Sequence, residues 1–375
     1  MRMKKRILQL IAVTGCLVAG SFLNQTGTLQ AEAAEIAVSE ETESTSIMAD
    51  LKEEDILYQG KDGKIEWCID KDGVLYLEGN GSYATPADWT ADEYKASIKK
   101  AVVNMSGMWY ASGMFCDCEN LEEIDFVHFD TSKVVYMEDM FYECSSLKEV
   151  DLSGCDTSNV IDMRYMFSRC RALETVKLNG WDISGVTSLY CLFNGCNALK
   201  EIELQGWETS NVTDTSYMFW DCEALKKLDI RTWDMSNVTN TFGMFGFAEN
   251  LTELYLPESL KVMGKYFLDD TDNLRRLYIP NSITDLSNAY IEDNTIIICN
   301  EGSAAHQWAK ENGQRYSLLG HVHQYEGTVL QNATSSKKGI IKCKCTASGC
   351  DEFYYMAYEY GHLHLIIPFF EDVAF

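Results

Sequence analysis

The sequence predicts an α/β repeat solenoid, in which short parallel strands stack on one another and short helical or 3₁₀ turns connect them. Three observations support this fold class. One pattern recurs every 26 residues from Leu121 to Leu251, and a fixed period in the range of about 20–50 residues is typical of solenoids. Each repeat contains a short in–out alternation followed by apolar residues near helical spacing. The chain is 46% apolar and 23% charged, a composition typical of ordered protein.

Five residue types keep one register through the repeats. They are leucine at 121, 147, 173, 199, 225 and 251; phenylalanine at 115, 141, 167, 193, 219 and 245; serine at 132, 158, 184, 210 and 236; valine at 134, 160, 186, 212 and 238; and cysteine at 118, 144, 170, 196 and 222. A single coil cannot bury these side chains by itself. Coils stacked at roughly 4.8 Å would bury them in one continuous core.

Each part of the repeat predicts a local structure. Leu147–Leu152 alternates and predicts a short strand. A mostly aromatic column then predicts a stack beneath the corner of the coil: Phe129, Cys155, Trp181, Trp207 and Trp233. Asp156 and Ser158 predict a turn, because short oxygen-bearing side chains accept hydrogen bonds from nearby backbone N–H groups. Met163 and Phe167 recur near helical spacing and predict a short helix or 3₁₀ turn.

Both ends of the array contain segments that would cover the core. Before the repeats, Lys64–Ile69 and Val74–Leu77 alternate around a turn ending in Gly73, which predicts a β-hairpin cap. After Leu251 the period shortens to 23 residues. Thr295–Cys299 then predicts a final strand, and Ser303–Asn312 predicts a helix that Gly313 would end.

The N-terminus predicts export. Residues 1–33 combine a basic start, an apolar run and Ala31-Glu32-Ala33, which is the pattern of a cleaved signal peptide. The apolar run is too short and too interrupted for a membrane span. An alternative is a lipoprotein anchored at Cys16, because Val13-Thr14-Gly15-Cys16 is similar to a lipobox. Either route gives a secreted or cell-surface protein. Residues 34–54 are acidic and aperiodic, which predicts a solvated linker.

The charge of the chain argues against some partners. The formal net charge is −26, and without residues 1–33 it is −29, from 27 basic and 56 acidic side chains. Such a chain is repelled by nucleic acid and by anionic membrane. We therefore expect no nucleic-acid partner, and the lack of a sufficiently long apolar run predicts no integral span in the mature chain.

The repeat resembles a known family. The coils GCDTSNVIDMRYMFSRCRAL and GWETSNVTDTSYMFWDCEAL are similar to the leucine-rich-repeat array of BspA-type surface proteins and to the mycoplasma lipoprotein repeat. The hairpin with Trp67 and the segment CNEGSAAHQWAKENG resemble the flanking parts of that family. The resemblance covers about residues 55–316. It implies an N-terminal cap module at 55–103 and a solenoid at 104–316. It also implies an exported bacterial protein that binds a host or neighbouring-cell protein or glycan.

Residues 317–375 predict a separate C-terminal tail. Short modules of the same exported proteins usually carry C-x-x-C-G, whereas this chain has Cys343-Lys344-Cys345 and then Cys350. Cys343, Cys345, Cys350, His321 and His323 are weak candidates for a metal site. C-x-C spacing is poor for structural zinc, which favours C-x₂₋₄-C, so a disulfide or a remnant of the module is the alternative.

The outward positions of the strands are the candidate binding residues. They are Asp125, Asp151, Lys177, Glu203, Asp229, Tyr255 and Tyr278. Solenoid surfaces often bind ligands, and exposed aromatic residues are favoured at interfaces. The alternative is that this face is polar only because it is wet. The cysteine column allows two interpretations as well, buried packing or disulfides between neighbouring coils.

No catalytic motif is recognised in the sequence. It lacks H-E-x-x-H, G-x-S-x-G, a phosphate-binding glycine loop and a dinucleotide fingerprint. We therefore expect no enzyme activity, no catalytic residues and no cofactor. Three hypotheses follow: a macromolecule-binding surface protein, a metal-binding or metal-dependent tail, and a purely structural envelope component.

Overall fold

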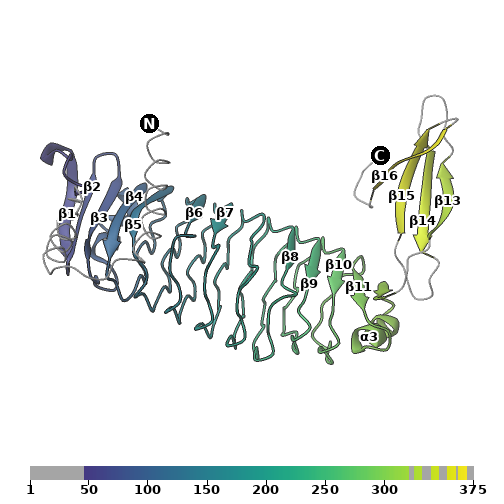
Figure 1. Ribbon diagram of the computed structural model, residues 1–375. Helices are drawn as coiled ribbons and strands as arrows, with labels where there is room; N and C mark the ends of the chain where they lie inside the picture. Colours follow the sequence, from purple (N-terminus) through teal and green to yellow (C-terminus); the bar gives the residue numbers. More distant parts are fainter. Residues whose placement is uncertain (1–45, 321–324, 332–338, 346–352, 360–361, 370–375) are drawn as a thin grey trace, which may run out of the picture. The chain divides into compact units, whose positions relative to one another are not determined.

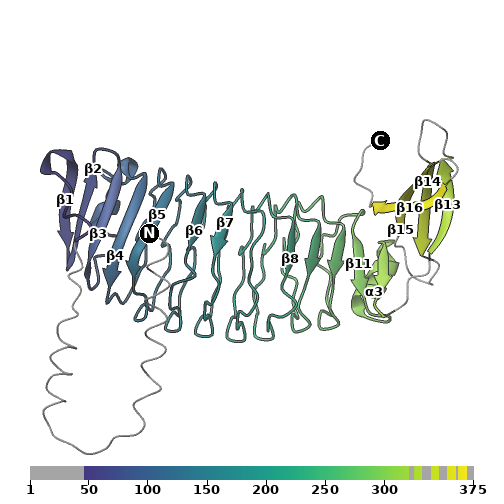
Figure 2. The same cartoon turned by 45° about the horizontal axis from the view of Figure 1, so that its top comes forward.

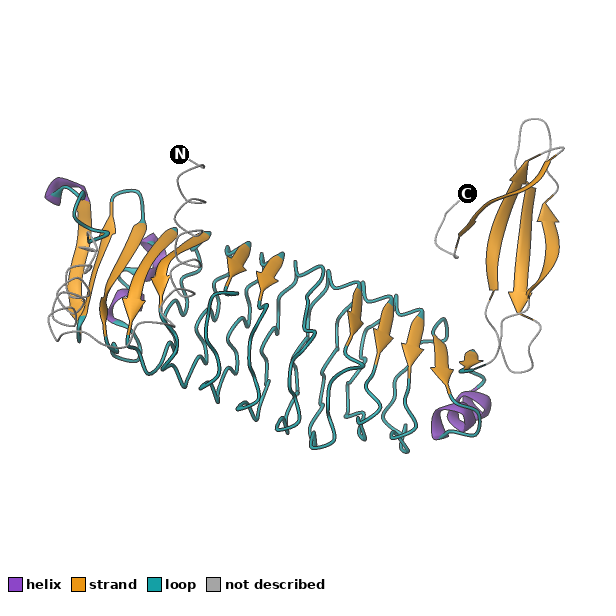
Figure 3. Ribbon diagram, viewed as in Figure 1, coloured by secondary structure: helices purple, strands orange, loops and turns teal. Residues whose placement is uncertain are grey.

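The computed structural model describes residues 46–320, 325–331, 339–345, 353–359 and 362–369. The predicted signal peptide, Cys16 and most of the predicted linker lie outside these residues. In the repeat region the chain forms a stack of coils with short parallel strands side by side along one edge (Figure 1). This arrangement confirms the predicted solenoid. Figure 3 shows that most of each coil between the strands is loop and turn.

The N-terminal part is a five-stranded sheet in the order β1-β2-β3-β4-β5 (Figure 2). Its strands are β1 Ile56–Asp62, β2 Ile65–Asp70, β3 Val74–Asn80, β4 Lys100–Ser106 and β5 Glu123–Phe129, and three short 3₁₀ turns accompany them, η2 Glu53–Asp55, η3 Asp88–Thr90 and η4 Lys95–Ser97. Strands β1 to β3 pair antiparallel, whereas β3, β4 and β5 pair parallel. The predicted hairpin is therefore confirmed, and its second strand, β3, pairs with β4, the next strand of the parallel stack.

The hairpin turn has a local cause in Asp70. Its carboxylate accepts hydrogen bonds from the backbone N–H groups of Asp72 and Val74, both at 2.9 Å. Gly73 between them has φ 83°, the left-handed conformation that glycine adopts without strain. This turn sets the register Ile69↔Leu75 of the two strands.

The strands of the coils pair in the register that the repeat predicts. They are β6 Glu149–Asp151, β7 Thr175–Lys177, β8 Lys227–Asp229, β9 Glu253–Tyr255, β10 Arg276–Tyr278, β11 Ile296–Cys299 and β12 Tyr316–Leu318. Val150 pairs with Val176, one 26-residue period later, and both side chains are buried. Strands β8 to β12 form one parallel sheet, and β6 and β7 form a separate pair.

The predicted helix does not form in the described 26-residue coils; single turns, in which an N–H bonds to the carbonyl three residues earlier as Ser168 does to Tyr165 at 2.8 Å, take its place. Residues 164–169 form consecutive turns, with left-handed residues two positions before and two positions after the repeated phenylalanine. The left-handed residues other than glycine include Asp139, Tyr165, Cys191 and Tyr217 before the phenylalanine, and Asp117, Glu143, Arg169, Asp221 and Phe247 after it. A helix would bond each N–H to the carbonyl four residues earlier. Here alternate N–H groups bond to the next coil instead, as Phe141 does to the Met166 carbonyl at 2.9 Å and Phe167 to the Leu192 carbonyl at 3.0 Å.

The core consists of stacks of identical side chains. The repeated phenylalanines are fully buried, and from Phe115 to Phe245 successive rings lie 5.3–5.7 Å apart and nearly parallel. In the corner column, the indole N–H groups of Trp181 and Trp233 donate to the carbonyls of Leu152 and Leu204 in the preceding coil, at 3.0 and 3.3 Å. The predicted tryptophan stack is therefore part of the interior.

The C-terminal end of the array agrees with the prediction. Strand β11 is followed by helix α3, Ala304–Asn312. The Ser303 side chain accepts a hydrogen bond from the His306 N–H at the start of the helix, and Gly313 ends it with φ 69°. Strand β12 then pairs parallel with β11. This last strand is an addition to the predicted closing segment.

The tail contains an antiparallel sheet in the order β13-β14-β15-β16. Its strands are β13 Tyr325–Gln331, β14 Gly339–Cys345, β15 Phe353–Glu359 and β16 His362–Phe369. Within the described part of the chain, no helix has the length and apolar character needed to cross a membrane.

Candidate binding surfaces

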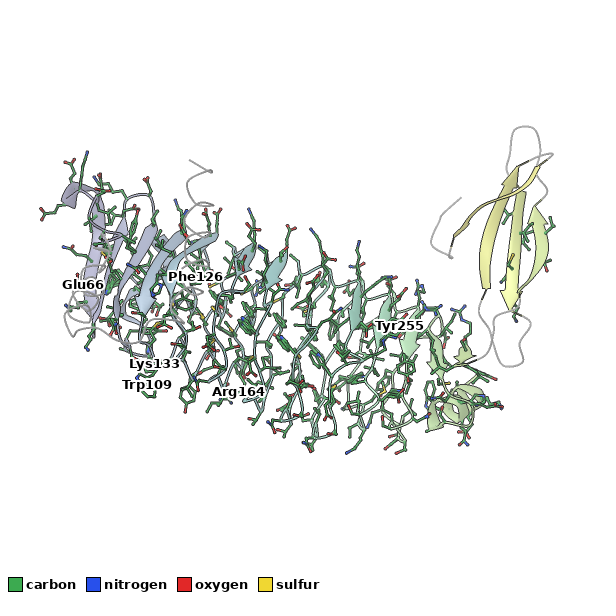
Figure 4. All side chains as sticks on the ribbon, viewed as in Figure 1. Glu66, Trp109, Phe126, Lys133, Arg164 and Tyr255 are labelled. Atoms are coloured by element: carbon green, nitrogen blue, oxygen red, sulfur yellow. The ribbon has the colours of Figure 1, made fainter. Side chains whose placement is uncertain are left out.

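The predicted binding residues lie on one row of the coils, which we call the sheet face. Asp125, Asp151, Lys177, Glu203 and Asp229 are exposed. Strand pairing places Asp151 beside Lys177 and Asp229 beside Tyr255. Figure 4 shows Tyr255 among the strands and Arg164 at the opposite edge of the stack in the same view. The sequence pattern thus identified outward side chains at five of the predicted positions, Asp125, Asp151, Lys177, Glu203 and Asp229.

Tyr278 does not belong to the exposed part of this row. It pairs in register between Tyr255 and Ile298, and only 7% of its surface is exposed. Its hydroxyl donates to the Glu258 carboxylate. Burial first, and this hydrogen bond second, raise the pKa of the Tyr278 hydroxyl. The expected exposure of Tyr278 is therefore wrong, because large neighbours on both sides enclose its ring.

Tyr255 is half-buried and forms part of a small cluster. The Arg231 guanidinium lies 4.8 Å from the centre of the Tyr255 ring and also forms an ion pair with Asp229 at 2.5 Å. An arginine over an aromatic face gains a cation–π attraction. The cluster presents an aromatic ring and a positioned guanidinium together on the sheet face.

Other charges on this face form ion pairs between coils. Lys177 pairs with Asp151 at 2.8 Å, and Lys227 pairs with Glu253 at 3.2 Å. The hydrogen bond from Lys177, together with those from the Ser153 side chain and backbone, lowers the pKa of the Asp151 carboxyl to about 2. These exposed pairs contribute little to stability. They do hold side chains in fixed positions, which lowers the entropy cost of binding a partner.

The strand row is interrupted in one coil. Residues 201–204 have no strand assignment, although the equivalent segments in neighbouring coils do. Glu203 is exposed at this interruption. The sheet face therefore has three hydrogen-bonded parts, β5 in the N-terminal sheet, the pair β6 and β7, and the sheet β8 to β12, with Glu203 between the last two.

Sequence reasoning missed a second surface, an aromatic ladder on the turn side of the coils. Its members are partly exposed: Tyr142, Tyr165, Tyr190, Tyr217, Trp220, Phe242, Phe247 and Tyr266. Successive ring centres are 4.7–6.3 Å apart, within the range of favourable aromatic contacts. The residues fall in different columns of the repeat, so no single column of the sequence reveals them.

The cysteine column is explained by packing. Every cysteine thiol whose bonding state the structure describes is free. The thiols of Cys144, Cys170, Cys196 and Cys222 each donate to a phenylalanine carbonyl of the preceding coil, at 3.0–3.2 Å. Burial raises the pKa of all four thiols. The column thus supplies small side chains that also donate a hydrogen bond inside the core.

The metal candidates of the tail are only partly described. His321, His323 and Cys350 lie outside the described residues, and so does the side chain of Cys345. The Cys343 side chain is buried on β14. Among the described residues, no three His, Cys, Asp or Glu side chains are grouped as a metal site would require.

The repeat region matches a known protein family model. Two segments of the chain, residues 92–176 and 171–256, match the family model described as a Mycoplasma protein of unknown function, DUF285. No curated protein matches the chain.

Three solved bacterial leucine-rich-repeat proteins are similar over most of their length. The chain is 13% identical to a leucine-rich-repeat protein of T. pallidum, and the match covers 69% of this chain and 98% of that one with a TM-score of 0.31. For a Eubacterium ventriosum protein the identity is 16%, the coverage 69% and 95%, and the TM-score 0.23. For a Bacteroides ovatus protein the identity is 14%, the coverage 70% and 100%, and the TM-score 0.21. Residues 92–256 carry the DUF285 repeat, and the resemblance of these coils to BspA-type leucine-rich-repeat proteins is confirmed.

Proposed function

We propose that this chain is an exported bacterial scaffold that binds a partner protein of a host or neighbouring cell through its sheet face. The observation that supports the proposal most strongly is the cluster of Arg231, Asp229 and Tyr255. It places an aromatic ring, a guanidinium and a carboxylate together on an exposed row. Arginine and tyrosine are enriched among residues that dominate binding energy at protein interfaces.

The rest of the row gives this cluster a suitable setting. Asp125 and Glu203 are exposed, and neither carboxylate has a hydrogen bond or ion pair with another described residue. Asp151 and Lys177 are held by their mutual ion pair. A partner protein with a complementary charge pattern would pair with the free carboxylates of Asp125 and Glu203, and such complementarity increases the association rate and the specificity.

Export is part of the proposal and has its own test. We propose that the signal peptide ends near Ala33, with a lipid anchor at Cys16 as the alternative. Mass spectrometry of the mature N-terminus distinguishes a start at residue 34 from a lipidated Cys16. A mature chain that retains Met1 in the cytoplasm would contradict both routes.

The binding test compares two sets of charge reversals in the full chain. The sheet-face variant carries Asp125→Lys and Glu203→Lys. The control carries Glu119→Lys and Glu249→Lys, which make the same change of charge at exposed positions off the strand row. Neither control carboxylate accepts a hydrogen bond from another described residue, so both variants should fold normally.

Each protein is immobilised and exposed to host extracellular-matrix extract and to extracts of neighbouring bacteria, and bound proteins are identified by mass spectrometry. The proposal predicts a saturable partner that the wild type and the control retain and the sheet-face variant loses. Loss of binding by both variants would indicate a nonspecific charge effect. Equal retention by both would remove Asp125 and Glu203 from the contact.

A further inference from the structure

A shallow cavity of about 540 Å³ opens on the turn side of the coils, within the aromatic ladder. Side chains from three successive coils line it. They include Arg169, Arg171, Tyr190, Asn194, Tyr217 and Trp220. The cavity is separate from the sheet face, so a ligand bound in it would be independent of the partner proposed for that face.

The cavity exists because one coil lacks a side chain. Gly195 is the second residue after Phe193, and the equivalent positions in the adjoining coils are Arg169 and Asp221. All three share the left-handed conformation, with φ 72°, 63° and 61°. A Cβ atom on Gly195 would lie 3.4 Å from the Arg169 Cα, an ordinary contact. The adjoining coils hold an arginine and an aspartate in this strained conformation, and space does not demand glycine here, so the effect of Gly195 is to leave a notch in the row.

The wall of the notch is aromatic and firmly positioned. Tyr217 contacts Tyr190 edge-to-face at 6.1 Å and Trp220 at 5.3 Å between ring centres. A Cβ atom on Gly246 in the next coil would come within 2.5 Å of the Trp220 ring, so this glycine allows the indole to lie against the backbone. All three aromatic side chains remain partly exposed and offer ring surface to a ligand.

The notch also contains an available cation. Arg169 is paired with Glu143 and lies 5.7 Å from the centre of the Tyr142 ring. Arg171 is exposed, and its guanidinium has no ion pair or hydrogen bond with the rest of the described chain. Its equivalents in the adjoining coils, Ser145 and Asn197, are uncharged. In a chain of net charge −26, this unpaired arginine beside an aromatic wall favours an anionic ligand.

We propose that the notch at Gly195 binds an acidic sugar residue, a pyranose that bears a carboxylate, within a glycan. The C–H face of the sugar ring packs on Trp220 and Tyr217. The Arg171 guanidinium pairs with the carboxylate, which matches its planar donors. Asn194 and Asp221 supply a donor and acceptors for sugar hydroxyls. The cavity volume lies in the range of about 300–1,000 Å³ that is usual for small-ligand sites.

An acidic peptide is a less complete fit to the same notch. An aspartate or glutamate side chain could pair with Arg171 but would present no saturated ring to the aromatic wall. The two ligands are distinguished by probes of similar length: a hyaluronan hexasaccharide, neutral chitohexaose and hexaglutamate. Alginate hexasaccharide and sialyllactose extend the acidic set to other sugar carboxylates. Binding to the full chain is followed by titration calorimetry and tryptophan fluorescence.

We expect at least one acidic sugar to bind at least ten times more tightly than both chitohexaose and hexaglutamate. Gly195→Gln should weaken that binding at least tenfold, because glutamine fills the notch without adding charge. Glu143, two coils earlier, has the same size and backbone conformation, so the variant should fold, with a somewhat lower melting temperature because left-handed backbone is strained for a residue other than glycine. Arg171→Gln, at an exposed position, should remove the preference for acidic over neutral sugar.

The control is Gly154→Gln, which makes the same substitution at an exposed glycine where an added Cβ meets nothing within 4 Å. This control should bind as the wild type does. No binding by any of the three acidic sugars would overturn the proposal. Undiminished binding of the acidic sugar by the Gly195→Gln variant would overturn it as well. The same holds if hexaglutamate binds as tightly as the acidic sugar and this binding depends on Arg171.

Discussion

The phenylalanine stack should make neighbouring coils energetically dependent on one another, and the dependence can be measured. Phe167 is fully buried, and its ring stacks on Phe141 at 5.4 Å and on Phe193 at 5.3 Å. Phe115 is also fully buried, but among the described rings it stacks only on Phe141, at 5.6 Å. Phe167→Leu therefore removes two ring pairs, whereas Phe115→Leu removes one.

The expected magnitude follows from the pairs lost. An aromatic pair contributes about 0.5–1.5 kcal/mol beyond its burial. Phe167→Leu should therefore lower the free energy of unfolding by about 0.5–1.5 kcal/mol more than Phe115→Leu. The packing loss common to both substitutions cancels in this difference. In a solenoid, stability is approximately a sum of coil terms and terms between neighbouring coils, so the effect should depend on adjacency.

A double-mutant cycle isolates the contact between coils. Urea unfolding is followed by tryptophan fluorescence for the single variants and for the Phe141→Leu/Phe167→Leu pair, whose rings touch. We expect a coupling of about 0.5–1.5 kcal/mol for this pair. The control is Phe115→Leu/Phe193→Leu, whose rings are three coils apart and should be additive within about 0.5 kcal/mol. Coupling in the adjacent pair that is no larger than in the control would refute the idea that ring stacking links the coils.

Three further predictions concern ionisation, thiols and the two tyrosines. Hydrogen bonds from Ser side chains and backbone lower the pKa of the turn aspartates Asp130, Asp156, Asp182 and Asp234. Because the folded state releases these protons more readily than the unfolded state, the stabilisation is present above pH 3.8, the ordinary pKa, and is lost as the pH falls through the lowered pKa values. The melting temperature of the variant with all four aspartates replaced by asparagine should therefore depend less on pH in this range. If its pH dependence equals that of the wild type, these aspartates are not the stabilising groups. Burial raises the pKa of Cys191 to about 11, and it raises the pKa values of the other core thiols as well. A thiol reagent at pH 8 should therefore label these cysteines only after denaturation. Rapid labelling of the native chain would show that the core is open. Tyr278→Ala should lower the free energy of unfolding by about 3 kcal/mol, as for other buried aromatics. Tyr255→Ala should lower it by less than about 1 kcal/mol and should weaken partner binding. Equal decreases of the free energy of unfolding in urea would contradict the difference in burial.

The interior of the coils could be predicted from the sequence because the position of a residue within the 26-residue repeat decides whether its side chain is buried. Residues that recur every 26 positions, such as Leu147 and Leu173, must occupy equivalent places in successive coils, and both are fully buried. The Asp–Ser turn was predictable for a local reason, since Asp156 accepts hydrogen bonds from the Ser158 N–H and hydroxyl at 3.0 and 2.6 Å. The closing helix was predictable from Ser303 and Gly313 at its two ends.

The path of the chain around each phenylalanine was decided by contacts between coils. Residues such as Tyr165 and Arg169 are left-handed without being glycine, so their local sequence carries no signal for that conformation. Left-handed backbone costs about 1–2 kcal/mol for such a residue. Hydrogen bonds to the next coil compensate for this cost, and they exist only after the coils have stacked. A helical spacing of apolar residues was therefore insufficient to predict a helix.

The sequence by itself determined which residues repeat, and hence the stacked core, the strand register and the outward row of the sheet face. The tertiary structure alone decided which outward residues stay exposed, as the enclosure of Tyr278 shows. It also brought side chains from different columns into the aromatic ladder and opened the notch at Gly195. The physical reason is that periodicity fixes a residue's position within its own coil, whereas exposure and cavities depend on the side chains that the neighbouring coils place beside it.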